Sequence, residues 1–534
     1  MKRFVVATAL LALSAPTYAT ESEEAALRAH VTFLASDAMR GREAGSPEYD
    51  IAAEYVASQF MALGLKPSGG GGRYLQPVPL LSTKLTDKGQ MRLRGPKGDV
   101  ALSFGDEFVM SASLKTAALK IDAPMVFVGF GVVAPEYKRD DYAGVDVRGK
   151  IVVVLSSAPK SIPGEIRAHY GNGATKAVLA ESKGAIGIIT VETPTRAKVR
   201  KFEDVARDWE SKRMTWRLPD GTGYAPGGKA PALAYISLKG AEKLFAALPG
   251  GAAKIMAAEE TPAAKLKPVA LGINALIETN SLIAPAESSN VAGLIEGSDP
   301  ALAPETIVLS GHLDHIGVGV PIKGDAIYNG AMDNAVGIAS MIEVAKRIMA
   351  TPVRPKRSLL FLAVTAEEKG LVGADYFARH PTIAREKIVA NVNLDMPVIT
   401  YDVKDVIAFG ADRSTIGPIT KAAAEKLGVI LSPDPAPEQA IFTRSDHYRF
   451  VQQGIPAVFL ATGKVDDGGS YDGFLANHYH KPSDQSDLPI NWQSGVKFVA
   501  LNEAITRALA DAPTRPVWNK GDFFGLLYNG VGAK

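Results

Sequence analysis

The feature that most constrains this chain is a regular alternation of strand-like and helical segments after Ser288. Five short apolar runs are rich in β-branched and aromatic residues, and segments with helical periodicity separate them; the runs are TIVLSGH (306–312), SLLFLAVT (358–365), ANVNLDM (390–396), DVIAFG (405–410) and PAVFLAT (456–462). Continuous apolar strands joined by helical crossovers are typical of a mostly parallel sheet with helices on both faces. The sequence therefore predicts a doubly wound α/β domain in this region.

Side chains suited to metal binding or acid/base chemistry follow three of these runs or lie in nearby loops. They are His312, Asp333, Glu367, Glu368, Asp395 and His480. Asp333 immediately precedes a segment with strong helical periodicity, 335–350. Because the carboxyl ends of parallel strands meet at one edge of a sheet, where such folds bind ligands, we expect these groups to converge. Imidazole and carboxylate ligands favour zinc, with cobalt or manganese as alternatives.

Each of these residues also has an ordinary structural explanation. A lone histidine such as His312 is more often a hydrogen-bonded core residue, and a Glu-Glu pair is usually a solvated turn. Asp395 could end a turn, and His480 could be a surface residue. The prediction of a metal site therefore depends on all of these groups meeting at one sheet edge.

The N-terminal segment has the pattern of a cleaved secretory signal. Lys2 and Arg3 precede an apolar run, 4–13, and small residues follow at Thr17 and Ala19. The run is too short to favour the alternative, a membrane-spanning anchor. We expect residues 1–19 to be removed, leaving a periplasmic or secreted protein with no stable membrane anchor.

Composition excludes several classes of function. Loss of the signal segment removes two of the 59 basic residues, so the mature chain has as many basic as acidic residues. This balance argues against a nucleic-acid partner or a polybasic membrane patch. The chain has no cysteine, which excludes disulfides, thiolate catalysis and cysteine-based zinc sites.

The region 107–279 has a different sequence pattern from the rest of the chain. It contains short strand-like runs such as 151–155 and 187–191, one helical stretch and no clustered metal ligands. We expect a separate small β-rich module there, with a spacer as the alternative. The predicted division is then 1–19 signal peptide, 20–106 N-terminal part of the catalytic domain, 107–279 insertion, and 280–534 the main catalytic domain.

Five motifs in order resemble metallopeptidase family 28, which includes the bacterial leucine aminopeptidases and aminopeptidase Y. They are SGHLDH (310–315), GAMDNAVG (330–337), TAEEKGLVGA (365–374), NLDM (393–396) and HKPSD (480–484). GREAGSPEY (41–49) resembles the N-terminal part of the same family. The segment 126–155 resembles the start of a protease-associated domain, a module often inserted in these enzymes. The resemblance implies a zinc exopeptidase fold with an inserted protease-associated domain.

The resemblance also implies a role for each residue of the predicted site. His312 and Asp395 would bind one zinc ion, Glu368 and His480 a second, and Asp333 would bridge the two. Glu367 would act as general base and then general acid, and the Asp314 carboxylate would orient His312. A cis peptide bond is expected between Asp333 and Asn334.

The function that the resemblance implies is hydrolysis of N-terminal residues from peptides by a water that two zinc ions and Glu367 activate. A carboxypeptidase of related fold, a glutaminyl cyclase-like enzyme and a non-catalytic receptor-like binding protein are the alternatives. The full set of ligands together with the base favours hydrolysis.

The segment TRSDH (443–447) contains Ser445, Asp446 and His447, but their adjacency in sequence does not establish a serine triad, and no GxSxG elbow accompanies them. The resemblance implies instead that this segment lines the substrate side, where His447 donates a hydrogen bond to the tetrahedral intermediate. A structural helix-capping cluster is the alternative. His315, His380 and His478 have no predicted role.

Overall fold

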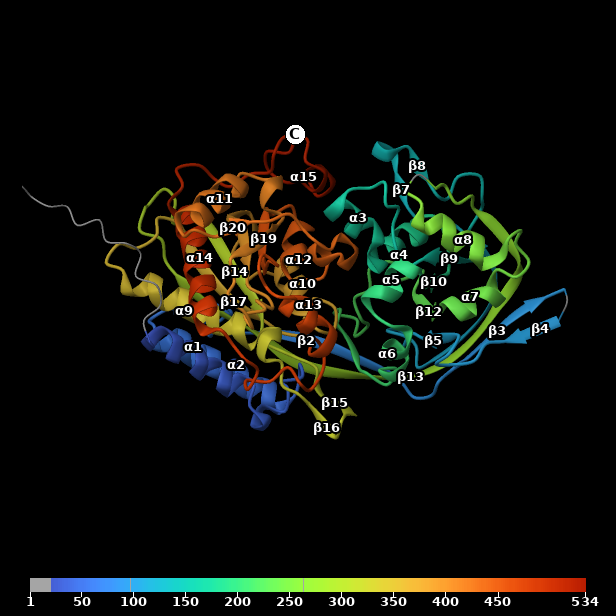
Figure 1. Cartoon of the computed structure of the whole chain (residues 1–534), viewed down its shortest axis with the longest axis horizontal. Helices are drawn as coiled ribbons and strands as arrows, with labels where there is room; N and C mark the ends of the chain where they lie inside the picture. The colour runs from blue at the N-terminus through green and yellow to red at the C-terminus, as the bar shows by residue number, and fades with distance from the viewer. Residues whose placement is uncertain (1–20, 97, 263) are drawn as a thin grey trace, which may run out of the picture.

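The computed structural model describes residues 21–96, 98–262 and 264–534, and the predicted signal segment 1–19 lies outside them. These residues form two lobes that lie side by side (Figure 1). One lobe contains the N-terminal helices and most of the chain after residue 281, and the other is built mainly from residues 86–280. No helix in the described part of the chain is long and apolar enough to cross a membrane.

The first lobe is built around a sheet whose central strands are parallel. Their order is β21 (Ala457–Thr462), β18 (Ile388–Asn393), β14 (Thr306–His312) and β17 (Ser358–Val364). On one edge, β19 (Asp405–Phe409) pairs antiparallel with β21, and β20 (Ile430–Leu431) lies parallel beside β19. On the other edge, antiparallel pairing adds β13 (Val269–Ile295), then β2 (Leu75–Leu85), then β11 (Arg213–Trp216). The mostly parallel sheet predicted from the apolar runs is therefore confirmed.

Both faces of this sheet are buried, because successive residues of each strand point to opposite faces. In β17, Leu359 and Phe361 pack in the core on one face, and Leu360 and Leu362 pack in the core on the other. Helices that cover the first face are α1 (Glu21–Leu34), α2 (Pro47–Ala62), α9 (Val336–Ala350), α11 (Ile416–Lys426) and α14 (Trp492–Asp511). The opposite face packs against α10 (Val372–Arg379) and α12 (His447–Val451). The lobe is doubly wound, as predicted.

The second lobe has its own sheet and hydrophobic core. Its strands are β3 (Gln90–Gly95), β4 (Gly98–Ala101), β5 (Phe108–Met110), β6 (Ala118–Phe127), β9 (Ile151–Leu155), β10 (Gly187–Val191) and β12 (Ala232–Ile236). Its helices are α3 (Gly164–Gly171), α4 (Gly173–Ser182), α5 (Pro194–Val199), α6 (Phe202–Arg207), α7 (Leu238–Leu244) and α8 (Gly251–Glu260). The core includes Phe127, Val153, Ile189 and Ile236.

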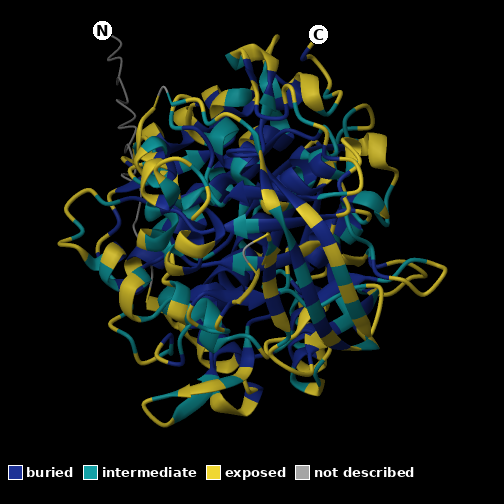
Figure 2. Cartoon of the chain, turned by 90° about the vertical axis from the view of Figure 1, so that its right-hand side faces the viewer, coloured by how far each residue is buried: buried dark blue, intermediate teal, exposed yellow. Residues whose placement is uncertain are grey.

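The long strand β13 joins the two lobes. Its first half pairs with β3 and β6 of the second lobe, and its second half pairs with β2 and β17 of the first. Figure 2, viewed from the side of the second lobe, shows buried and exposed residues alternating along the long strands. Residues 90–101, which precede the predicted start of the inserted module at 107, pair within this second sheet. The assignment of 107–279 to a protease-associated domain stays a prediction.

Candidate metal centre

The carboxyl edge of the parallel strands gathers the predicted ligands. His312 is the last residue of β14, Asp395 follows β18, and Glu368 follows β17. Asp333 lies in the turn η3 (Ala331–Ala335), which leads directly into α9. Since β14 is parallel to both β17 and β18, these residues reach the same edge of the sheet. The predicted convergence of the strand ends is present in the structure.

The distances divide the ligands into two groups that share Asp333. His312 Nε2 lies 3.1 Å from Asp333 Oδ1 and 3.1 Å from Asp395 Oδ1. His480 Nε2 lies 3.3 Å from Asp333 Oδ2 and 3.1 Å from Glu368 Oε2. The two oxygens of one carboxylate therefore face two different imidazoles. This is the arrangement that a carboxylate needs to bridge two cations.

The chemistry of this donor set fits divalent metal ions. His312, Asp333 and Asp395 can each place one ligand atom within 4.8 Å of the others, and so can His315, Asp333 and Glu368. Burial acts to lower the pKa of His312, but the negative charges of Glu367 and Asp395 raise this pKa well above its usual value. Such an excess of buried negative charge is stabilised by bound cations. Nitrogen and oxygen donors without sulfur suit zinc.

His315, which had no predicted role, belongs to the site. Its ring is fully buried, and Nδ1 lies 2.6 Å from Glu368 Oε1. One oxygen of Glu368 therefore contacts His315 while the other contacts His480. The SGHLDH motif contains this histidine, but sequence spacing does not show whether it faces Glu368.

Asp314 supports the site differently from the role that the resemblance implied. The atom that contacts His312 Nδ1, at 3.0 Å, is the main-chain carbonyl oxygen of Asp314. The Asp314 carboxylate instead accepts hydrogen bonds from the main-chain N–H groups of Glu367 at 3.0 Å and Glu368 at 3.4 Å. Because a carboxylate is a strong acceptor for adjacent amides, Asp314 fixes the turn that carries both glutamates.

Asp484, the last residue of the HKPSD motif, holds the turn that contains Asp333. Its carboxylate oxygens accept hydrogen bonds from the N–H of Met332 at 2.9 Å and of Asp333 at 3.1 Å. The side chain of Asn334 accepts from the N–H of Met396 at 3.0 Å and donates to the carbonyl of Leu394 at 3.0 Å. The predicted cis peptide bond between Asp333 and Asn334 is confirmed.

Glu367 makes none of the His–carboxylate contacts that define the two groups of ligands. Desolvation raises its pKa well above the usual value, the charge of His312 opposes this, and the charges of Asp395 and Asp446 add to it. A carboxyl group with a raised pKa, outside the set of ligands but beside it, is suited to accept and return a proton.

The segment 443–447 does not form a serine triad. Ser445 Oγ donates a hydrogen bond to Asp395 Oδ2 and accepts one from Asn393 Nδ2 at 2.6 Å, so it orients a predicted ligand. His447 has no exposed surface and packs against the rings of Phe442 and Phe459. Neither ring nitrogen of His447 has a hydrogen-bond partner among the described residues. The predicted substrate contact of His447 stays a prediction.

Tyr479 and Arg444 lie beside the predicted ligands, and no sequence motif pointed to either of them. The ring of Tyr479 stacks on that of His480, with 3.9 Å between centroids. Arg444 Nη2 donates a hydrogen bond to the Tyr479 hydroxyl at 2.9 Å. This pair connects the metal ligands to the boundary between the two lobes.

Part of this chain is similar to known peptidases. Residues 290–505 match the model of peptidase family M28. A "probable leucine aminopeptidase 2" from Aspergillus oryzae is 30% identical over 184 residues, which are 33% of this chain and 33% of the relative. Leupeptin-inactivating enzyme 1 from Streptomyces exfoliatus is 30% identical over 169 residues, 31% of this chain and 34% of the relative. The chain thus matches about a third of the length of these two relatives.

An aminopeptidase from Aneurinibacillus sp. strain AM-1 has a similar structure. The TM-score is 0.54 at 21% sequence identity, and the similarity covers 92% of this chain and 95% of that one. At this identity the similarity shows the fold. All the predicted ligands, from His312 to His480, lie inside the segment that the family model matches. Over residues 290–505, this chain is similar to peptidase family M28.

Proposed function

We propose that this protein is a zinc-dependent aminopeptidase that removes N-terminal residues from peptides. The observation that carries the proposal is the shared carboxylate of Asp333, whose two oxygens contact His312 and His480 separately. In the proposed arrangement His312 and Asp395 would hold one zinc ion, Glu368 and His480 would hold the second, and Asp333 would be shared between them. The names of the relatives matched above support this choice of activity.

The chain's own residues then move the proton. Zinc ions bound here would supply an acidified water and polarise the carbonyl of the scissile bond. A carboxylate oxygen of Glu367 takes the proton of the attacking water and returns it to the leaving nitrogen. Desolvation raises the pKa of Glu367, and a raised pKa is a property that a carboxyl group acting as both base and acid needs.

A panel of peptides tests the assignment. The same sequence is assayed with a free N-terminus, with an acetylated N-terminus and with an amidated C-terminus, each with and without a chelator. We expect chelator-sensitive release of the N-terminal residue from the free and the amidated peptides and no cleavage of the acetylated one. Cleavage of the acetylated peptide from its C-terminus would assign a carboxypeptidase instead. Release of ammonia from an N-terminal glutamine would assign a cyclase.

Metal analysis separates an enzyme from a binding scaffold. The purified protein, dialysed against zinc and then against metal-free buffer, is expected to retain about two zinc ions per chain by atomic emission. Retention of none would support the receptor-like alternative. We further propose that the chain is exported, on the signal-like pattern of residues 1–19; the first residue of the mature protein, read by N-terminal sequencing, should lie near Thr20.

A further inference from the structure

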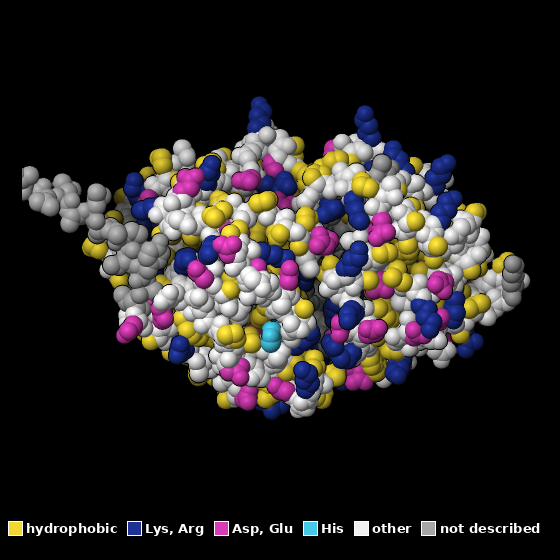
Figure 3. Space-filling view, viewed as in Figure 1, with side chains coloured by type: hydrophobic (Ala, Val, Ile, Leu, Met, Phe, Trp, Pro, Cys, Tyr) yellow, Lys and Arg dark blue, Asp and Glu magenta, His cyan; other side chains and the backbone are white. Residues whose placement is uncertain are grey.

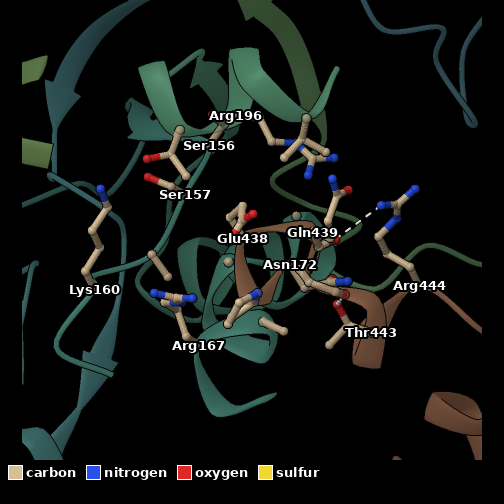
Figure 4. A pocket seen from close by; sticks show the side chains of 18 of the residues that line it. Ser156, Ser157, Lys160, Arg167, Asn172, Arg196, Glu438, Gln439, Thr443 and Arg444 are labelled. Carbon is tan, nitrogen blue, oxygen red and sulfur yellow. Dashed lines mark hydrogen bonds between the residues drawn. The ribbon is translucent and has the colours of Figure 1, made fainter. Parts of the chain in front are cut away.

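A cavity of about 680 Å³ lies between the two lobes. Its walls come from residues 156–199 and Glu259 of the second lobe and from residues 437–444 of the first (Figure 4). Small-molecule sites commonly measure about 300 to 1,000 Å³ and often lie between domains. Figure 3 shows basic side chains gathered along the boundary between the lobes. The cavity is therefore large enough to hold part of a peptide.

The lining of this cavity has an excess of unpaired positive charge. Five basic side chains line it: Lys160, Arg167, Arg196, Lys198 and Arg444. Across the described ranges, none of these five forms an ion pair. The two acidic residues in the wall are Glu438 and Glu259, and the Glu259 carboxylate already accepts hydrogen bonds from the hydroxyls of Ser157 at 2.7 Å and Thr195 at 3.2 Å.

A sixth basic residue, Lys176, is occupied by the protein itself. Its Nζ donates to the main-chain carbonyls of Leu155 at 2.6 Å and Ser157 at 2.7 Å, and burial lowers its pKa to about 7. Lys176 therefore shapes the wall, and the other five side chains supply the charge that faces the cavity.

Two of these side chains come from opposite lobes and line the same cavity. Arg196 comes from α5 of the second lobe, and Arg444 follows the short turn η7 (Ile441–Thr443) of the first. Figure 4 places their guanidinium groups on the same side of the cavity. Burial lowers the pKa of Arg196 to about 10, and the positive charge of Arg444 adds to this effect. Two guanidinium groups that repel one another, neither of them in an ion pair among the described residues, form a site for an anion.

This pair of arginines is connected to the proposed metal centre. Arg444 donates to the Tyr479 hydroxyl, and the Tyr479 ring stacks on His480. An anion held by Arg196 and Arg444 therefore lies next to the side chain that covers a metal ligand. The positive charge of the cavity also repels the free α-amine of a peptide, so the part of a substrate that enters it is the part beyond the scissile bond.

We propose, on the basis of the function proposed above, that this cavity binds a carboxylate in the leaving part of the peptide substrate. The carboxylate is the C-terminal group of a short peptide or an acidic side chain near the scissile bond. The preferred substrates are then short peptides with a free C-terminus, or peptides with an acidic residue near the scissile bond. Arg196 and Arg444 bind the carboxylate from opposite lobes, so both lobes contribute to selection of the substrate.

Three tripeptides with the same first two residues test this proposal. The first ends in a free carboxylate, the second ends in an amide, and the third is amidated but has glutamate as its last residue. We expect kcat/KM for the second to be about ten- to a hundredfold lower than for the first, as loss of charge-assisted hydrogen bonds predicts. If kcat/KM for the third peptide returns to the level of the first, an acidic side chain is a sufficient source of the carboxylate. If it stays at the level of the second, the source is the C-terminal group.

The variant Arg196→Gln removes one of the two guanidinium groups, so the ratio of kcat/KM for the acid to kcat/KM for the amide should fall toward one. Among the described residues, Arg196 has no hydrogen bond to the residues of the metal centre. Arg385→Gln is the matched control, since it removes the same charge from a second cavity, lined by Gln453 and Arg515, elsewhere on the first lobe. The control should keep the ratio of the unaltered protein. Equal rates for acid and amide in the unaltered protein would overturn the subsite while leaving the peptidase function intact.

Binding without turnover separates the two proposals. Titration calorimetry with the zinc-loaded Glu367→Gln protein should give a Kd about tenfold or more lower for the acid than for the amide, and this difference should shrink as salt is added. Hydrolysis of none of the tripeptides by the unaltered protein, together with a preserved difference in Kd, would reject the peptidase function and keep the carboxylate site. The same Kd for acid and amide would reject the site.

Discussion

Two adjacent glutamates at the metal centre have opposite electrostatic surroundings. The contacts of Glu368 with His480 and His315 overcome the effect of burial and keep its pKa well below the usual value, whereas the pKa of Glu367 is raised. These surroundings suit Glu368 to bind a metal ion and Glu367 to carry a proton. We predict that Glu367→Gln retains the metal ions but lowers kcat by roughly two to four powers of ten. Metal content and steady-state kinetics measure the two effects.

Glu368→Gln is the control for Glu367→Gln. Glu368→Gln should lose at least one metal ion on dialysis, because it weakens contacts to both His315 and His480. A Glu367→Gln protein with nearly normal turnover would remove Glu367 from its proposed role.

At the scale of the elements, a buried arginine joins the N-terminal helices to the loops of the metal centre. The Arg42 guanidinium donates to the carbonyls of Leu34 at 2.5 Å, Leu313 at 2.9 Å, Asn329 at 2.6 Å and Gly330 at 3.1 Å. Arg42→Met would leave four buried carbonyls without their donor. We predict a loss of at least ~3 kcal/mol in the free energy of unfolding, measured by urea denaturation.

Arg40 provides a matched comparison two positions earlier. Its side chain is 56% exposed and lies 3.4 Å from the Glu48 carboxylate. Arg40→Met should change the free energy of unfolding by less than ~1 kcal/mol, as is usual for an exposed ion pair. Similar losses for the two variants would show that the buried hydrogen bonds of Arg42 are not the source of stability.

At the scale of the whole molecule, α3 of the second lobe docks on the first lobe through a buried aromatic cluster. His169 Nδ1 lies 2.7 Å from the Tyr448 hydroxyl, and the ring also contacts Phe523, Phe524 and Tyr528. Beside it, Glu165 accepts hydrogen bonds from Arg413 and from the N–H of Gly410. These contacts hold the two walls of the basic cavity in place.

Burial lowers the pKa of His169 to about 4, from about 6.5 in the unfolded chain. Between these pH values the unfolded chain binds a proton that the folded protein does not. The contribution of His169 to stability is therefore complete above pH 6.5 and falls by ~1.4 kcal/mol per pH unit toward pH 4, a total of roughly 3 kcal/mol. We predict that His169→Gln flattens the dependence of the free energy of unfolding on pH in this range. Denaturation curves with the same pH slope for both proteins would contradict this.

Much of the first lobe follows from local patterns in the sequence. Apolar runs such as 306–312 and 358–364 form buried parallel strands because both faces of the sheet are covered, so the signal lies in the run itself. The positions of His312, Glu367 and Asp395 follow from the same patterns, since each comes at or just after the end of a strand. The sheet edge at which the predicted ligands lie could therefore be predicted. The positions of Asp333 and His480 could not, because the packing of their loops sets them.

The contacts that support the predicted ligands join residues far apart in the sequence, and no local pattern predicts such pairs. Asp484 binds the turn of Asp333 across about 150 residues of chain, and Arg42 reaches the loop around Gly330 across almost twice that separation. The buried state of His447 likewise results from packing of Phe442 and Phe459 around it.

The sequence by itself determined the alternation of strands and helices, and the identity and order of the side chains proposed to bind metal, because hydrophobic periodicity and residue chemistry are local properties. Only the tertiary structure decided which oxygen of Asp333 faces which histidine, how β13 unites the two lobes, and that Arg196 and Arg444 face one cavity. These features arise when segments distant in sequence pack together, and the packing of the whole chain sets their geometry.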